Sequence, residues 1–225
     1  MIKNLIFDVD GTIWNSTPIV AKGWNRAVVE TGCSKAVITP EILQKEFGQP
    51  MDVIADHLFG DVEDMEKRQA LLDKCCEYEQ ALLLENEEDI SYPGVRDGMK
   101  ALAEKYRLYI VSNCQCGYIE LVMRKNGITH LIKDFECFGN TGTCKGETIR
   151  ILMERNGISG DSAVYIGDTQ GDCEAAAMAG IPFIFAEYGF GTVDDAKVSI
   201  TEFAQIEKAV PECEEGMRIG AAPLS

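Results

Sequence analysis

The chain has 225 residues, of which 46% are hydrophobic and 26% charged, a balance that is ordinary for a globular protein and excludes global disorder. Its 37 acidic and 21 basic residues give a formal net charge of −16, and the resulting field repels polyanions. We therefore expect no nucleic-acid partner and no membrane partner. No apolar run approaches the roughly 18 residues of a membrane-spanning helix, and the first apolar segment is too short for a signal peptide, so we expect a cytoplasmic protein.

The first predicted element is a buried strand at residues 4–9, and Asp8 and Asp10 lie at its end, followed by a glycine. From residue 15 to residue 88 no segment has a convincing strand pattern. Helical patterns cover residues 18–30, 40–47, 51–58 and 62–84 instead. The Thr39 hydroxyl followed by Pro40 is typical of a helix start. These patterns predict an inserted, all-helical domain at residues 15–88.

Beyond residue 88, strand and helix patterns alternate. The predicted strands are residues 108–113, 162–168 and 181–187, and the predicted helices are residues 94–105, 117–126, 146–156 and 172–179. This alternation predicts an α/β fold: a Rossmann-like parallel sheet with helices on both faces, formed by residues 1–14 and 89–225. We expect weak structure from residue 211 to the end.

Three of the predicted strands end in reactive polar residues: Asp8 and Asp10, then Ser112 and Asn113, then Asp168. The carboxyl ends of parallel strands meet at one edge of a sheet, so these side chains are expected to converge. Clustered carboxylates raise one another's pKa unless a cation lies among them. Oxygen-only ligands favour a hard divalent metal, and we expect Mg²⁺.

Lys145 follows a loop and begins a predicted helix, so its ammonium group can point into the same cleft. Ser112 and the N–H groups that follow it, at a strand-to-helix turn, are suited to binding phosphate oxygens. Together with a metal, these groups would supply the local positive charge that the acidic molecule lacks elsewhere.

Four ordered motifs carry a resemblance to a known family. They are "DVDGT" at residues 8–12, the strand end at Ser112 and Asn113, Lys145, and "GDTQGD" at residues 167–172. In order and spacing they resemble the haloacid dehalogenase-like hydrolase superfamily, and the helical segment at residues 15–88 resembles the small helical cap domain of that superfamily.

The resemblance implies a role for each matching position. Asp8 matches the nucleophile that forms an aspartyl-phosphate, and Asp10 matches the general acid and base. Asp8, Asp168 and the Asp10 backbone carbonyl match the Mg²⁺ ligands. Ser112, Asn113 and Lys145 match phosphate-binding positions, and Asp172 matches either a further metal ligand or a partner of Lys145. In the cap, the turn at residues 46–52 is expected to face the cleft, with Gln49 helping to select the substrate.

The function expected from this resemblance is Mg²⁺-dependent hydrolysis of a small phosphorylated metabolite, similar to phosphoglycolate phosphatases. One alternative is a sugar-phosphate mutase similar to beta-phosphoglucomutase. A second is a non-catalytic phosphate-binding regulator, against which the Asp8 and Asp10 pair argues. A dehalogenase is disfavoured because that branch needs neither Asp10 as acid and base nor a metal. The sequence leaves the substrate and the oligomeric state open.

Overall fold

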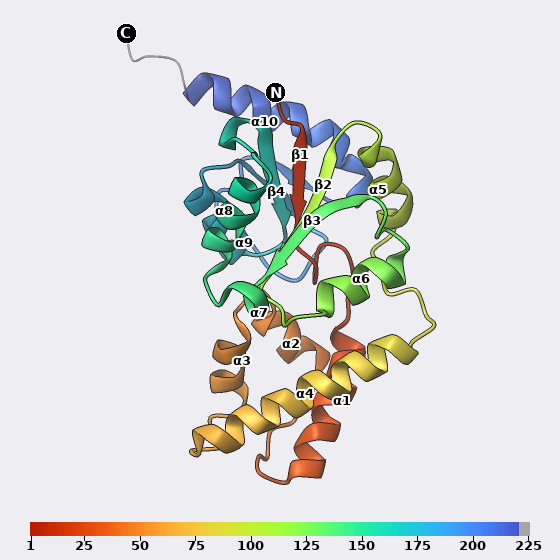
Figure 1. Cartoon of the computed structure of the whole chain (residues 1–225), viewed down its shortest axis with the longest axis vertical. Coiled ribbons are helices and arrows are strands. Elements are labelled where there is room, and N and C mark those ends of the chain that lie inside the picture. The colour runs from red at the N-terminus through yellow and green to blue at the C-terminus, as the bar shows by residue number, and fades with distance from the viewer. Residues whose placement is uncertain (221–225) are drawn as a thin grey trace. The chain divides into compact units, whose positions relative to one another are not determined.

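A computed structural model describes residues 1–220, and the chain divides into two compact units (Figure 1). The larger unit comprises Met1–Trp14 and the chain from Ser91 onward, and the smaller unit is Asn15–Ile90. The assignment of the smaller unit as a cap domain stays a prediction.

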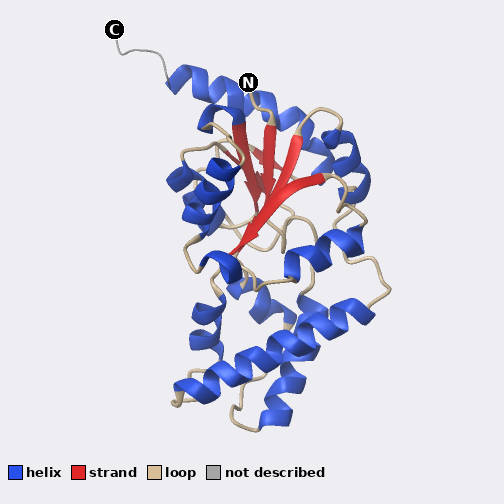
Figure 2. Ribbon diagram, viewed as in Figure 1, coloured by secondary structure: helices blue, strands red, loops and turns tan. Residues whose placement is uncertain are grey.

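The larger unit contains a six-stranded parallel sheet (Figure 2). Its strands are β1 (Asn4–Phe7), β2 (Arg107–Ser112), β3 (Ile132–Cys137), β4 (Ala163–Gly167), β5 (Phe183–Ala186) and β6 (Ser199–Ile200). Their order is β3-β2-β1-β4-β5-β6. From β1 the chain therefore adds β2 and β3 on one side, and it then crosses over to add β4, β5 and β6 on the other side. Ligands of such sheets bind at this reversal point, beyond the carboxyl ends of the strands.

The predicted α/β fold is confirmed, and four strands match their predicted ranges within two residues at each end. The sequence patterns do not predict β6, which is only two residues long, or β3. β3 lies at the edge of the sheet and its sequence, IKDFEC, has charged residues at Lys133, Asp134 and Glu136. An edge strand needs apolar side chains at few positions, so it lacks the continuous apolar run that identifies a buried parallel strand.

Helices cover both faces of this sheet. They are α5 (Val95–Ala103), α6 (Tyr118–Asn126), α7 (Phe138–Thr141), α8 (Lys145–Arg155), α9 (Gln170–Ala179) and α10 (Ile206–Gly220). On one face, Ile149 and Leu152 of α8 and Ala176 of α9 form a buried cluster with Ile6 of β1 and Tyr165 of β4.

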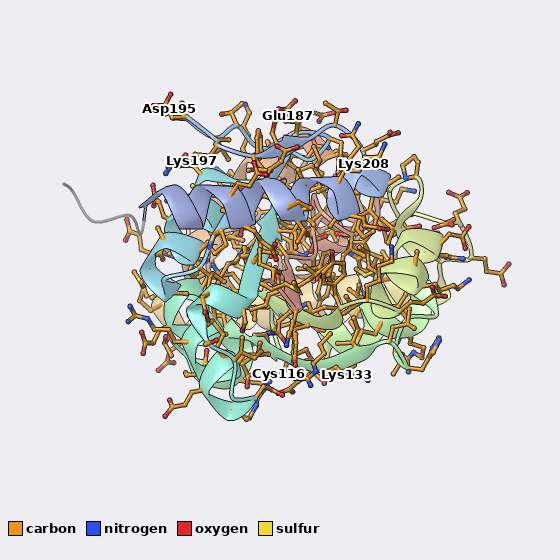
Figure 3. The ribbon with its side chains drawn as sticks, turned by 90° about the horizontal axis from the view of Figure 1, so that it is seen from above. Cys116, Lys133, Glu187, Asp195, Lys197 and Lys208 are labelled. Carbon is orange, nitrogen blue, oxygen red and sulfur yellow. The ribbon has the colours of Figure 1, made fainter. Side chains whose placement is uncertain are left out.

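The opposite face of the sheet packs against α5, α10 and the short turn at Phe203–Gln205. Phe7 alternates with Ile6 along β1 and stacks on Phe203 with ring centroids 5.9 Å apart. Figure 3 looks onto α10, and the side chains labelled there are exposed: Cys116, Lys133, Glu187, Asp195, Lys197 and Lys208.

The expectation of weak structure from residue 211 is wrong for residues 211–220, which belong to α10; residues 221–225 lie outside the described part. Pro211 and the run of glutamates made this segment look irregular. Helix α10 is held by tertiary packing, since Ala209, Val210 and Cys213 are buried. None of the described helices is long and apolar enough to cross a membrane.

The smaller unit is helical, and its predicted helices are confirmed within three residues at each end. They are α1 (Thr17–Thr31), α2 (Pro40–Glu46), α3 (Met51–Leu58) and α4 (Met65–Glu85). The Thr39 hydroxyl accepts a hydrogen bond from the Ile42 N–H at 3.3 Å, as its capping role requires. Helices α1 and α4 are joined by a buried hydrogen bond of 2.8 Å from the Trp24 indole to Glu79.

Candidate active site

The site begins with the register of the three central strands. Phe7 at the end of β1 pairs with Ile110 of β2 and with Ile166 of β4. Ser112 and Asp168 each lie two residues beyond these partners. Polar residues from the three strands therefore meet beside Asp8 and Asp10, at the carboxyl edge where the strand order reverses.

A buried ammonium group connects two of the carboxylates. Lys145, the first residue of α8, donates hydrogen bonds to Asp8 Oδ1 at 2.9 Å and to Asp172 Oδ1 at 2.6 Å. Its side chain is 4% exposed, against 3% for Asp8 and 0% for Asp172. Hydrogen bonds between charged groups that are this short and this well shielded from solvent hold the lysine and both carboxylates in place.

Both oxygens of Asp172 are engaged by protein donors. Oδ1 binds Lys145, and Oδ2 accepts from the N–H groups of Asp168 and Thr169 at 3.2 and 3.0 Å and from the Thr169 hydroxyl at 2.7 Å. Thr169 and Asp172 thereby form a capping box at the start of α9. Of the two roles expected for Asp172, this geometry favours the partner of Lys145.

Asp168 is enclosed by two neighbouring turns. Its Oδ2 accepts a hydrogen bond from the Phe190 N–H at 2.7 Å, and its Oδ1 lies 3.4 Å from the Thr12 hydroxyl. Gly11 has a φ of 86°, and a Cβ there would lie 2.0 Å from Asp168 Oδ2. A Cβ at Gly189 would lie 2.2 Å from Asp168 Cβ. Glycine is therefore required at both turns for this carboxylate to fit.

Burial and repulsion from neighbouring acids oppose the ionisation of Asp8 and Asp168. Burial raises the pKa of Asp8 to about 6; Lys145 opposes this shift and Asp172 adds to it. Burial raises the pKa of Asp168 well above its usual value, and Asp172 and Asp8 raise it further. Burial also disfavours the Lys145 ammonium, but Asp172 and Asp8 outweigh this effect and raise its pKa. Lys145 is therefore charged at neutral pH, but its positive charge does not fully offset the negative charge around Asp8 and Asp168.

The donor set fits a hard divalent cation. Asp8, Asp168 and Asp172 each offer a carboxylate oxygen, and these oxygens lie within 4.8 Å of one another. All three residues are buried, and a single ammonium group cannot balance three carboxylates. Oxygen-only ligands with excess negative charge suit Mg²⁺.

The other predicted site residues have different environments. The side chain of Asp10 is half-buried and accepts a hydrogen bond from the Tyr118 hydroxyl at 3.0 Å. Ser112 is buried at the end of β2, and Asn113 is half-buried in the following loop. Gln49 belongs to the smaller unit, in an exposed turn between α2 and α3.

Several contacts of the carboxylates were missed by sequence reasoning. The main ones come from Tyr118, which contacts Asp10, and from the Phe190 backbone, which contacts Asp168. The glycines on both sides of Phe190, in "YGFG" just after β5, signal a tight turn at the same sheet edge. Tyr118 offers a weaker signal, namely an aromatic residue directly after Gly117 at the start of the helix that follows β2.

Comparison with known proteins identifies the family of this chain. Residues 5–186 match the family described as haloacid dehalogenase-like hydrolase. A phosphoglycolate phosphatase of Colwellia psychrerythraea is 24% identical over 204 residues, covering 85% of this chain and 87% of that protein. The crystal structure of a predicted phosphoglycolate phosphatase from Haemophilus somnus has a TM-score of 0.79 at 23% identity, covering 93% of this chain and 98% of that one.

A second solved structure, beta-phosphoglucomutase of Clostridium difficile, has a TM-score of 0.78 at 16% identity and covers 97% of this chain and 100% of that one. At these identities the two solved structures show a shared fold. The sequence match, by contrast, runs from β1 through β5 and includes all four motifs. The chain belongs to the haloacid dehalogenase-like hydrolase family.

Proposed function

We propose that this protein is a Mg²⁺-dependent phosphatase that hydrolyses the phosphomonoester of a small metabolite through an aspartyl-phosphate intermediate. The observation that carries the proposal is the Lys145 ammonium, buried between Asp8 and Asp172 and next to Asp168. A solvated surface cluster would not place a lysine at 4% exposure between two acids. The relatives named phosphoglycolate phosphatase, which the chain matches along most of its length, support a small phosphorylated substrate.

The proposed reaction has two steps. In the first, a carboxylate oxygen of Asp8 bonds to phosphorus, the bond from phosphorus to the ester oxygen breaks, and Asp10 protonates the departing oxygen. In the second, Asp10 takes a proton from water, the water oxygen bonds to phosphorus, and the bond to Asp8 breaks to release inorganic phosphate. Lys145 holds Asp8 Oδ1 at 2.9 Å, which leaves Oδ2 as the attacking oxygen.

The residues that would hold the metal are Asp8, Asp168 and the backbone carbonyl of Asp10. Bound there, Mg²⁺ would offset the charge of the carboxylates and of the phosphoryl oxygens. Ser112 and Asn113 would bind the phosphoryl group from the end of β2. Asp172 would keep Lys145 in position.

The test measures phosphate release from p-nitrophenyl phosphate and from a panel of small phosphorylated metabolites, including 2-phosphoglycolate. We expect hydrolysis with Mg²⁺, loss of activity in EDTA, and recovery when Mg²⁺ is restored. Asp168→Asn should lower turnover, whereas Asp161→Asn, at an exposed carboxylate, should leave it unchanged. Hydrolysis that persists undiminished in EDTA would remove the metal from the proposal.

The same panel separates the alternatives. Conversion of a sugar 1-phosphate into the 6-phosphate without phosphate release would identify a mutase instead. A failure to hydrolyse any ester in the presence of Mg²⁺ would favour a phosphate-binding regulator. The role of Gln49 in selecting the substrate stays a prediction, and Gln49→Ala should change the relative rates across the panel more than the rate with p-nitrophenyl phosphate.

A further inference from the structure

Tyr118 contacts Asp10, the proposed general acid and base, from a different segment of the chain. It is the first residue of α6, directly after the loop that follows β2, and it is 2% exposed. Its hydroxyl donates a hydrogen bond to Asp10 Oδ1 at 3.0 Å, across 108 positions of sequence. A buried phenol thus holds one oxygen of a half-buried carboxylate.

The ring of Tyr118 is fixed by Trp14. The two rings meet edge to face, with centroids 5.8 Å apart and an interplanar angle of 71°. Trp14 is 1% exposed, and its carbonyl accepts a hydrogen bond of 3.0 Å from the Gly11 N–H, so it closes the turn that carries Asp10. Tyr118 therefore contacts this turn twice, once through its hydroxyl and once through its ring, and its distance from Asp10 is set by packing.

A carboxyl group that transfers protons in both directions must keep its orientation whether or not it carries the proton. Asp10 Oδ1 can accept the phenol hydrogen bond in both states, provided that the proton is carried by Oδ2. We infer that Tyr118 is a positioning residue that holds Asp10 Oδ1, so that proton transfer to the leaving group and from water passes through Oδ2. This inference rests on the proposed function, because it gives Tyr118 a role only if Asp10 is the acid and base.

A second buried tyrosine near the carboxylates makes a different contact. The Tyr165 hydroxyl donates to the Val111 carbonyl at 2.8 Å and lies 3.5 Å from Asp8 Oδ1. Its shorter bond goes to the backbone of β2, so its geometry is that of a tie between strands. The hydroxyl of Tyr118, by contrast, makes its 3.0 Å hydrogen bond to the side chain of Asp10.

The experiment compares Tyr118→Phe with the unsubstituted protein on a series of aryl phosphates, from p-nitrophenyl phosphate to phenyl phosphate. The substitution removes only the hydroxyl and keeps the ring against Trp14. Proton donation matters most for a poor leaving group, so kcat/KM should fall less than about threefold for p-nitrophenyl phosphate and about tenfold or more for phenyl phosphate. Tyr109→Phe is the matched control, since it removes a buried phenol hydroxyl on β2 and should show no trend along the series.

Asp10→Asn, alone and combined with Tyr118→Phe, separates this inference from the proposed function. If Tyr118 acts through Asp10, Asp10→Asn shows a steeper leaving-group dependence and the double variant is no slower than Asp10→Asn. A uniform loss along the series in Tyr118→Phe, or a multiplied loss in the double variant, would overturn the inference and leave the proposed function standing. If Asp10→Asn itself shows no leaving-group dependence, the proposed acid role falls, and the inference falls with it.

Discussion

At the scale of single residues, the network around Lys145 places acids that look alike in sequence in different hydrogen-bonding environments. Asp172 has both oxygens occupied by Lys145 and by three donors around Thr169. Asp8 shares Lys145 but is engaged mainly through Oδ1. The carboxylate that is most constrained by protein donors is the least suited to attack phosphorus or to bind a metal, and the less constrained Asp8 is better suited to both.

The first residue-scale prediction separates Asp8 from Asp10. With a phosphorus-labelled aryl ester, the unsubstituted protein should carry label on Asp8, and Asp8→Asn should carry none because an amide oxygen is a poor nucleophile. Asp10→Asn should still be labelled by this good leaving group but should lose the label slowly, because no base activates water. Rapid quench followed by mass spectrometry of the peptide containing residues 4–22 measures both. Turnover of Asp8→Asn at the rate of the unsubstituted protein would exclude a covalent mechanism.

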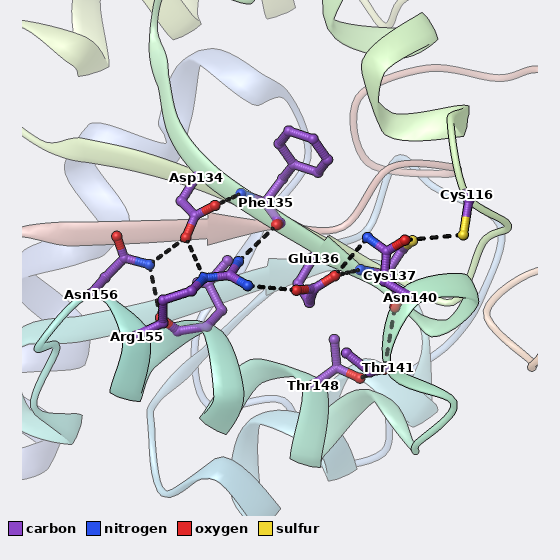
Figure 4. Close-up of polar contacts among 11 residues, drawn as sticks. Cys116, Asp134, Phe135, Glu136, Cys137, Asn140, Thr141, Thr148, Arg155 and Asn156 are labelled. Atoms are coloured by element: carbon purple, nitrogen blue, oxygen red, sulfur yellow. Dashed lines mark hydrogen bonds and ion pairs between the residues drawn. The ribbon is translucent and has the colours of Figure 1, made fainter.

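At the scale of elements, the edge strand β3 is tied to α8 by polar side chains (Figure 4). Arg155, the last residue of α8, donates to Asp134 at 2.8 Å, to Glu136 at 2.7 Å and to the Phe135 carbonyl at 3.1 Å. Asn156 adds a bond of 2.6 Å to Asp134. These contacts hold the edge strand where its sequence offers few apolar residues for packing.

The contacts of Arg155 and Asn156 with the acids of β3 predict how the free energy of unfolding depends on pH. Burial alone would raise the pKa of Asp134, but hydrogen bonds from Asn156 and Arg155 outweigh it and lower the pKa. In Glu136, the bonds from Asn140 and Arg155 likewise outweigh burial and lower the pKa. A carboxyl whose folded pKa is depressed stabilises the fold above its unfolded pKa, about 4, and loses this contribution as pH falls through the folded pKa.

Arg155→Met should therefore lower the free energy of unfolding at pH 7 by about 1–2 kcal/mol, and the deficit should shrink as pH falls below about 4. Chemical denaturation at several pH values measures it. Lys100→Met is the matched control, since Lys100 pairs with Asp97 on the surface and should change stability by less than about 0.5 kcal/mol. A deficit that stays constant down to pH 3 would show that Arg155 acts by packing alone.

At the scale of the whole molecule, the reversal of strand order at β1 decides which residues can meet. Because β1 lies between β2 and β4, the ends of three strands that are far apart in sequence open onto one edge. The glycines of the turns around Asp168 let the backbone close on this carboxylate. The fold thus concentrates three buried carboxylates at one place, beside a single lysine.

Binding of Mg²⁺ should therefore stabilise the folded protein. At a concentration 100 times its Kd, a ligand of the native state alone adds about 2.7 kcal/mol, so the unfolding midpoint should rise with added Mg²⁺ and fall back with EDTA. Asp168→Asn should abolish most of this rise, and Asp161→Asn should retain it. Differential scanning calorimetry measures the effect without any activity assay. An equal rise in Asp168→Asn would place the bound ion elsewhere.

Most of the local elements and all of the candidate site residues could be predicted from the sequence alone. The apolar runs of β1, β2, β4 and β5, the Thr39 cap and the helix-ending glycines such as Gly127 all depend on neighbours within a few positions, which a linear pattern records. The motif spacing also predicts Asp8, Lys145 and Asp168 as site residues, and the structure brings these residues together.

The partners of these groups could not be predicted from the sequence, because they depend on how the chain packs. β3 pairs with β2 although its sequence has no continuous apolar run, and α10 packs against the sheet although Pro211 lies inside it. The bonds from Lys145 to Asp8 and from Tyr118 to Asp10 join residues 137 and 108 positions apart. Such contacts depend on strand order, register and burial, which are properties of the packed sheet and are absent from any short window of sequence.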